Sequence, residues 1–97
     1  MLKNYTVDLP PNGRVWFRFW EDECVVFHEL SGQIHLIAEM GAFLLKLISE
    51  QPYTRSQLLA HFLNSFELSM DFNLEEFLDK LIIEYQNLGL LTVTENS

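Results

Sequence analysis

Residues 27–48 read FHELSGQIHLIAEMGAFLLKLI, and the spacing of the apolar residues changes inside this run. Up to about Ile37 the apolar residues tend to alternate, which is typical of a strand with one buried face. After Ile37 they recur every three or four residues, which is typical of an amphipathic helix. The chain is therefore expected to pass from a strand directly into a helix, and both elements must bury their apolar faces in one core.

The composition supports one domain with a real core. The chain has 97 residues, of which 48% are hydrophobic, and eight of them are Phe. Domains of this size fold without disulfide bonds when enough apolar surface is buried. The lone Cys24 suits a reducing compartment. No apolar stretch reaches the ~20 residues of a membrane span, and the first residues lack the apolar region of a secretory signal. We therefore expect a cytoplasmic protein without a membrane partner.

Three strands are expected in the first half of the chain. Residues 14–20 (RVWFRFW) are aromatic and β-branched, and their alternation places Val15, Phe17 and Phe19 toward the core. The second strand covers residues 24–28 and the third covers residues 34–37. The acidic residues 21–23 between the first two strands are expected to form a solvated turn.

Ser31-Gly32 is expected to form a two-residue turn between the second and third strands. Such a turn sets the hairpin register: Leu30 with Gln33, His28 with His35, and Phe27 with Leu36. Two imidazoles that face each other can contribute to a zinc site, but zinc takes three or four ligands. Cys24 is four residues from His28, too far along a strand to complete the set. We therefore expect neither a metal site nor a cofactor.

Three helices follow, and their ends carry recognisable signals. The first begins near residue 38 and stops at residues 49–52 (SEQP). Thr54 and Gln57 have capping-box spacing at the start of the second helix, and residues 67–72 form a polar linker. Asn73 caps the third helix, and Gly89 has the position of a C′ residue after its end. Residues 90–93 could add a short strand.

Each helix has one stripe of apolar residues that is expected to face the core. In the first helix the stripe consists of Met40, Phe43, Leu44, Leu47 and Ile48. In the second helix it consists of Leu59, Phe62, Leu63 and Phe66. In the third helix it consists of Leu74, Leu78, Leu81, Tyr85 and Leu88.

This order of elements predicts an α+β fold of winged-helix type, with a three-stranded antiparallel sheet followed by a three-helix unit. We expect an N-terminal extended, loop-like segment at residues 1–13, the domain at residues 14–93 and a flexible tail at residues 94–97. No glycine-rich phosphate loop, nucleophile elbow or Cys-His spacing is present, so we expect no enzyme activity.

The charges argue against a nucleic-acid partner. The net charge is −8, and the third helix carries Glu75, Glu76, Asp79 and Glu84 against Lys80. Binding to a duplex depends on Lys and Arg that meet phosphates. A winged-helix transcription factor therefore remains only an alternative, as does a structural dimerisation module, because an uncovered edge strand invites self-pairing into a homodimer.

The third helix also suggests a binding groove. Ile82 falls beside its apolar stripe, and Ile83 falls nearly opposite the stripe among charged residues. If this flank lies beside the edge of the third strand, the two could hold an extended peptide that adds to the sheet. Plain packing and a dimer contact are the alternatives.

The sequence resembles the PqqD family of small peptide-chaperone domains, which are also called recognition elements for ribosomally made precursor peptides. The resemblance covers residues 15–93 and depends on the order of VVFHELSGQIHLI, AEMGAFLLKLI, PYTRSQLLAHFL and NLEEFLDKLIIEYQNLGLL. The VVFH-SG-HLI form is similar to the subgroup called the HPr-rel-A system PqqD family. The HELSGQIH hairpin departs from the more generic turn of PqqD itself.

This resemblance implies a non-catalytic protein that binds the leader of a precursor peptide and presents it to a modifying enzyme, either a radical-SAM protein or a kinase-like partner. The peptide would add to the third strand and lie against the third helix. Carried over by position, the implied peptide-binding residues are Ile34, His35, Leu36 and Ile37 on the strand and Asp79, Ile82, Ile83 and Gln86 on the helix.

Overall fold

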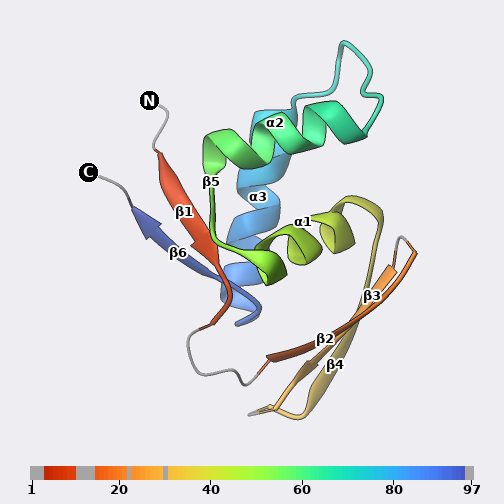
Figure 1. Cartoon of the computed structure of the whole chain (residues 1–97), viewed down its shortest axis with the longest axis vertical. Coiled ribbons are helices and arrows are strands. Elements are labelled where there is room, and N and C mark those ends of the chain that lie inside the picture. The colour runs from red at the N-terminus through yellow and green to blue at the C-terminus, as the bar shows by residue number, and fades with distance from the viewer. Residues whose placement is uncertain (1–3, 11–14, 22, 30, 96–97) are drawn as a thin grey trace.

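The computed structural model describes residues 4–10, 15–21, 23–29 and 31–95, which form an α+β fold of two three-stranded antiparallel sheets and three helices (Figure 1). The first sheet has the strand order β5-β1-β6, with β1 at Tyr5–Asp8, β5 at Tyr53–Thr54 and β6 at Thr92–Glu95. The second sheet has the order β2-β3-β4, with β2 at Val15–Trp20, β3 at Glu23–His28 and β4 at Gln33–Ala38. The helices are α1 at Glu39–Glu50, α2 at Arg55–Ser65 and α3 at Leu74–Asn87.

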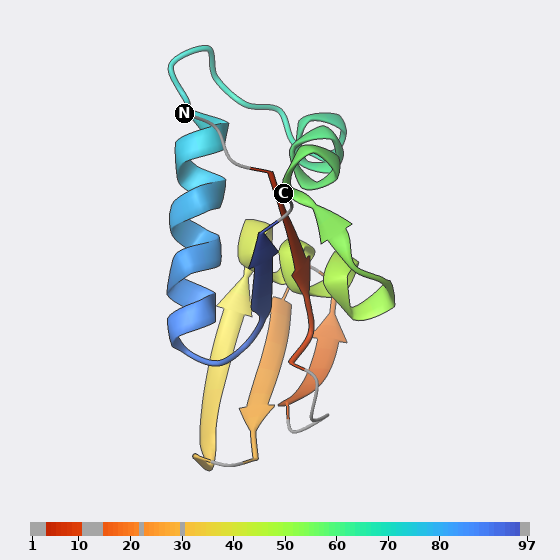
Figure 2. The ribbon, with the colours of Figure 1, turned by 90° about the vertical axis from the view of Figure 1, so that its left-hand side faces the viewer.

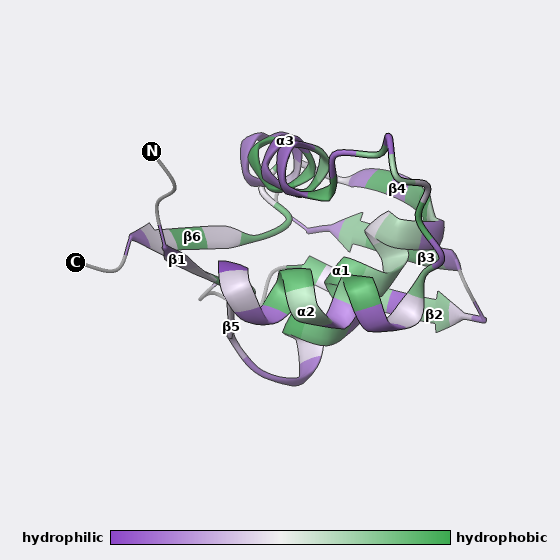
Figure 3. Cartoon of the chain, turned by 90° about the horizontal axis from the view of Figure 1, so that it is seen from above, coloured by the Kyte–Doolittle hydropathy of each residue, from purple (hydrophilic) through white to green (hydrophobic). Residues whose placement is uncertain are grey.

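One hydrophobic core joins both sheets and all three helices. Its fully buried members include Val7 from β1, Val26 from β3, Leu44 from α1, Phe62 from α2 and Leu78 from α3. The helix α1 lies where the two sheets meet (Figure 1), while α3 runs beside β4 (Figures 2 and 3). Among the described residues, no helix combines the length and the apolar character that crossing a membrane requires.

The chain passes from β4 into α1 with no connecting residue, as the change in apolar spacing predicts. Ala38 ends the strand and Glu39 begins the helix. The backbone of Glu39 has a φ of 54°, a left-handed conformation that is uncommon outside glycine and that makes the turn in a single step. Gly41, in the first turn of α1, leaves the space that the phenol of Tyr85 on α3 occupies. The hairpin and the helix can therefore close over the same core.

The face assignment of β2 is confirmed, but the predicted register of the second hairpin is wrong. Val15, Phe17 and Phe19 are half-buried against the core, as expected. In the observed register His28 pairs with Gln33, Phe27 with Ile34, and Val26 with His35. Four residues therefore lie between the paired His28 and Gln33, and Gly32, with a φ of 71°, donates its N–H to the carbonyl of His28 at 2.8 Å. The shift is two residues, so each side chain keeps its face of the sheet. Leu30 lies outside the described residues.

The sheet β5-β1-β6 was not predicted. Residues 5–8 were expected to belong to a loop, yet β1 is the central strand, paired with β5 on one side and β6 on the other. The terminal strand covers Thr92–Glu95 rather than residues 90–93, since Leu90 and Leu91 are buried in the core. The expected flexible tail is thus wrong for residues 94 and 95, and residues 96–97 lie outside the description.

The helix ends follow their sequence signals. Thr54 and Gln57 form the capping box, Asn73 accepts from the backbone N–H of Glu76, and α1 stops at Glu50. Gly89 has a φ of 78° and donates to the carbonyl of Gln86, while Leu90 donates to that of Tyr85, which together form a Schellman motif.

The predicted apolar stripes need correction in all three helices. In α1, Leu45 is fully buried in addition to the predicted residues. In α2, Leu63 is exposed, whereas Leu58 and Arg55 are buried. In α3, Ile82 is buried, whereas Leu88 is partly exposed.

Cys24 is expected to react slowly in the native state. Its side chain is fully buried, and this burial raises the pKa of the thiol to about 11. Because only the thiolate is nucleophilic, labelling with Ellman's reagent at pH 8 should be at least roughly 100-fold slower than in the denatured chain. Equal rates in native and denatured protein would contradict the buried position of Cys24.

Candidate functional site

The strand β4 is an edge of its sheet. It pairs with β3 on one side, and no described strand pairs with its other side. The leading strand β1, which could have covered this edge, belongs to the other sheet. The outer row of N–H and C=O groups of β4 is therefore available to another extended segment.

A depression of about 460 Å³ lies between β4 and α3. From the strand it is lined by the five consecutive residues Ile34, His35, Leu36, Ile37 and Ala38, and from the helix by Glu84, Tyr85 and Leu88. Most of its lining residues are apolar by type, but polar atoms make up more of the lining surface than apolar atoms do, and Glu84 adds one carboxylate. Tyr85 is buried, and this burial raises the pKa of its phenol to about 12. The depression thus combines a strand edge that no described strand covers with a largely polar lining surface and one negative charge.

The residues of β4 present different groups to the two sides of the sheet. His35 and the buried Ile37 point inward, since each pairs with an inward residue of β3, while Ile34 and Leu36 are exposed on the outer face. The Nε2 atom of His35 is buried and has no hydrogen-bond partner among the described residues. A hydrogen-bonding group brought into the depression could satisfy this nitrogen.

The two histidines occupy positions on one face of the sheet, diagonal to each other. His28 packs against Gly89, because a Cβ atom there would stand 2.8 Å from the Nε2 atom of His28. The direct opposition of His28 and His35 that the two-residue turn required does not occur. Within the described part of the chain, no group of three or more His, Cys, Asp or Glu residues is arranged to hold a metal ion.

The helix residues implied by the resemblance lie elsewhere on α3 than the residues that line the depression. Ile82 is buried in the core. Asp79 and Ile83 line a separate shallow hollow that they share with Arg55, and Gln86 is exposed. At about 100° per residue, these positions fall on the other side of α3 from Glu84 and Leu88.

Asp79 is held in an ionic network that joins three elements. Its carboxylate accepts hydrogen bonds from the Nε and Nη2 atoms of Arg55 at 2.8 and 2.9 Å and from the hydroxyl of Tyr5. The bond from Arg55 holds the pKa of Asp79 below its usual value. Burial, followed by the bond to Asp79, raises the pKa of Tyr5. Arg55 is itself buried and also meets Glu75 at 3.3 Å. This network ties β1, α2 and α3 together, which gives Asp79 a structural role.

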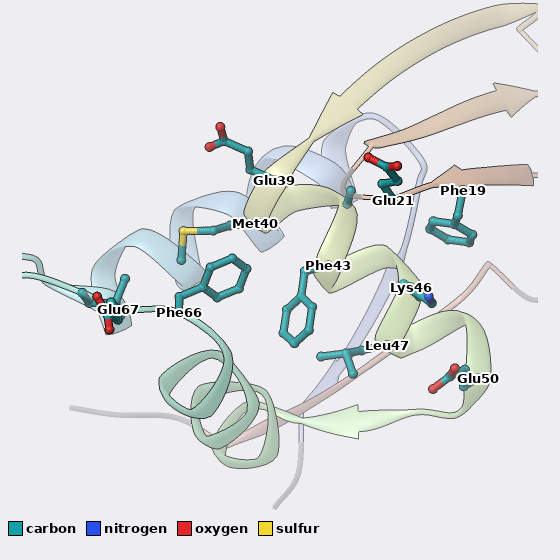
Figure 4. Close-up of a pocket in the computed structure, with 12 residues that line it drawn as sticks. Phe19, Glu21, Glu39, Met40, Phe43, Lys46, Leu47, Glu50, Phe66 and Glu67 are labelled. Atoms are coloured by element: carbon teal, nitrogen blue, oxygen red, sulfur yellow. The ribbon is translucent and has the colours of Figure 1, made fainter.

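A second hollow of about 620 Å³ opens between the end of β2, the outer side of α1 and the segment after α2 (Figure 4). Apolar side chains form its walls: Phe19, Met40, Phe43, Leu47, Phe66 and Leu68. Around them stand the carboxylates of Glu21, Glu39, Glu50 and Glu67, with Lys46 as the cation of the lining. The rings of Phe43 and Phe66 meet edge to face at 5.1 Å. This hollow is larger than the depression beside β4, but β2 contributes only Phe19 to it.

The sequence did not identify Glu84, Tyr85 and Leu88 as lining residues. Tyr85 and Leu88 were assigned to the core stripe of α3. A stripe of Leu74, Leu78, Ile82 and Tyr85 has helical spacing that is just as regular as that of the predicted stripe. The choice between Ile82 and Leu88 for the core depends on how α3 is rotated against the sheet.

None of the protein-family models, curated proteins or solved structures compared with this chain matches it.

Proposed function

We propose that this protein is a non-catalytic adaptor that binds an extended peptide along the free edge of β4 and presents it to a modifying enzyme. The observation that carries the proposal is a strand edge that pairs with none of the described strands and lies beside a depression lined by five consecutive residues of β4 and by α3. Strand addition provides affinity through backbone hydrogen bonds, and the adjoining side chains provide selectivity. β2 is the other edge of this sheet, and it contributes only Phe19 to the hollow at its end.

The two faces of β4 define the peptide that would fit. Side chains of an added strand alternate between the faces of the sheet. Those on the outer face would lie next to Ile34 and Leu36, which are exposed and apolar. Those on the inner face would enter the depression above His35 and near Glu84. We therefore expect a preference for apolar residues at alternate positions, with a Lys or Arg at an inward position where Glu84 can meet it.

The resemblance to the PqqD family extends the proposal to the class of partner. On this hypothesis β2, β3, β4 and the three helices correspond to the winged-helix unit of that family, and the sheet β5-β1-β6 supplements it. The peptide would then be the leader of a ribosomally made precursor, and the enzyme would be a radical-SAM or kinase-like protein. The acidic α3 supports a peptide ligand over a duplex, since Glu75, Glu76 and Glu84 are exposed on it.

The proposal is tested by titrating ¹⁵N-labelled protein with a capped peptide of about eight residues that alternates Val and Thr and carries one inward Lys. Amide shifts should concentrate at Ile34–Ala38 and Glu84–Leu88. A scan of single N-methyl groups along the peptide should reduce binding at every second position, because only alternate N–H groups of an added strand face β4. Shifts centred on Phe19, Met40 and Phe43 instead would assign binding to the other hollow and contradict the proposal.

Glu84→Gln should weaken binding of the Lys peptide by roughly two- to fivefold, the loss expected for one partly exposed ion pair. The same variant should leave the affinity for a peptide with Gln in place of Lys unchanged. Glu76→Gln is the matched control, because Glu76 lies on α3 outside the depression and pairs with Lys80 at 2.9 Å.

A further inference from the structure

The outer face of the sheet β2-β3-β4 is almost entirely apolar. The observed pairing arranges its side chains in three rows across the strands: Trp16, Phe27 and Ile34; Arg18, Val25 and Leu36; Trp20, Glu23 and Ala38. Trp16 is 60% exposed, Trp20 is 51% exposed, and Ile34 and Leu36 are each 69% exposed. These large side chains are neighbours on one surface rather than scattered exposures.

The area of this face approaches what a stable dimer requires. If each of its large side chains offers on the order of 200 Å², the exposed fractions of Trp16, Trp20, Phe27, Ile34 and Leu36 leave roughly 600 Å² of apolar surface. The largest apolar patch on a typical monomeric protein covers about 300–600 Å², so this value is at the top of that range. It is also close to the ~800 Å² that each partner contributes to a standard interface, before Val25 and Ala38 are added.

The charge of this face differs from that of the rest of the chain. The net charge is −8, which makes two copies repel each other over most of their surfaces. Within the three rows, however, the ionisable groups are Arg18 and Glu23, whose charges cancel. The guanidinium of Arg18 lies 5.8 Å from the ring centre of Trp20, where the aromatic face accommodates it. The carboxylate of Glu29 also reaches this face, where it accepts a hydrogen bond from Nε1 of Trp16 at 3.4 Å. This face therefore carries little net charge compared with the rest of the chain, and its apolar area is what favours association.

We propose that two copies of this chain associate face to face through these three rows, as an aligned sandwich of two sheets about 10 Å apart. The two-fold axis that runs along β3 places β2 of one copy over β4 of the other. Trp16 and Trp20 then pack over Ile34 and Ala38 of the partner. The two Arg18 side chains stay apart, whereas the two Glu23 side chains face each other at the end of β3, each diagonal to an Arg18 of its own sheet. An interface of this kind is self-complementary and closed, so it forms a dimer rather than a filament.

The dimer leaves the free edge of β4 in the plane of the sheet, so the backbone groups for strand addition stay accessible. Ile34 and Leu36 belong both to the dimer face and to the outer side of the proposed peptide site. The tryptophans make it directly measurable, because the chain has two and both lie on this face. We expect sedimentation equilibrium over a micromolar concentration series to show a monomer–dimer equilibrium. The tryptophan emission should shift to the blue over the same range as the rings leave water.

Trp16→Thr should weaken the dimer by roughly thirtyfold, the loss typical of a tryptophan that is buried in an interface. Trp20 remains as the fluorescent reporter in this variant, and the circular dichroism spectrum reports whether the fold is kept. Leu63→Thr is the control, because Leu63 is 62% exposed on α2 and lies outside this face. Arg18→Glu should also dissociate the dimer. It removes the cation near Glu23 and leaves two carboxylates in the rows of each copy, so the two faces repel each other, while the apolar area is unchanged.

Three results would overturn this inference. The first is a protein that stays monomeric, with unchanged tryptophan emission, through the whole series. The second is a dimer that survives both Trp16→Thr and Arg18→Glu. The third is a dimer that Leu63→Thr abolishes. Binding of the Lys peptide should persist in Trp16→Thr, since Trp16 is on β2 rather than β4, so failure of the dimer and failure of the peptide site can be told apart.

Discussion

Asp79→Ala is expected to lower the free energy of unfolding by about 2–3 kcal/mol. The variant leaves Arg55, which is 5% exposed, without its two hydrogen bonds to the carboxylate, and it removes the acceptor of the Tyr5 hydroxyl. The loss is smaller than that of a fully buried pair because the side chain of Asp79 is 37% exposed and Glu75 still meets Arg55. Denaturant unfolding followed by circular dichroism at pH 7 measures it.

Two comparisons separate this network from an ordinary surface charge. Glu76→Ala removes the exposed pair with Lys80 and should cost about 0.5 kcal/mol or less. The double variant Arg55→Met/Asp79→Ala should recover part of the free energy of unfolding that Asp79→Ala loses, because the buried charge of Arg55 is then removed as well. If Asp79→Ala costs no more than Glu76→Ala, the network does not stabilise the fold.

The pH dependence of the same loss follows from the lowered pKa of Asp79. A carboxyl whose pKa is lower in the folded state contributes stability above its ordinary pKa of about 4. That contribution is lost as the pH falls through the folded-state pKa. The difference in stability between the wild-type protein and Asp79→Ala should therefore be complete at pH 7 and shrink below about pH 4.

Gly41→Ala is expected to destabilise the protein by about 2 kcal/mol, although alanine is the better helix former by about 1 kcal/mol. A Cβ atom at position 41 would stand 2.1 Å from the hydroxyl oxygen of Tyr85 and 2.8 Å from the Cγ2 atom of Ile37. Helix α3 would have to move away from α1, or Tyr85 would have to leave its buried position. Denaturant unfolding again measures the change.

Tyr85→Phe provides the matching test, because it removes the oxygen that the new methyl group would meet. The next ring atom, the Cζ of Tyr85, would be at 3.3 Å, a tight but tolerable contact. In the Tyr85→Phe background, Gly41→Ala should therefore cost at least about 1 kcal/mol less than in the wild-type protein. Equal costs in both backgrounds would show that the hydroxyl of Tyr85 does not fill the space beside Gly41.

The local elements were largely predictable, because their signals are close together in the sequence. The capping box at Thr54, the Asn73 cap, Gly89 and the alternation of β2 each act within a few residues. The change of apolar spacing near Ile37 located the passage from β4 to α1 within two residues of its observed place.

The candidate site was predicted only on its strand side. Residues 34–37 were recognisable as an edge strand after a hairpin, and they line the depression. The helix side depends on the rotation of α3, which the packing of Ile82 into the core fixes. Since Leu88 and Ile82 both continue a regular stripe from Leu74, no spacing rule separates them.

The sequence by itself determined the three helices, the hairpins and the faces of their strands, because caps, turns and side-chain alternation are properties of neighbouring residues. Tertiary structure alone decided the sheet β5-β1-β6 and the helix wall of the site. Strand β1 is only four residues long, and it is a strand because Tyr53–Thr54 and Thr92–Glu95 are brought beside it. Hydrogen bonds between such distant segments form only after the core has assembled, so no local pattern records them.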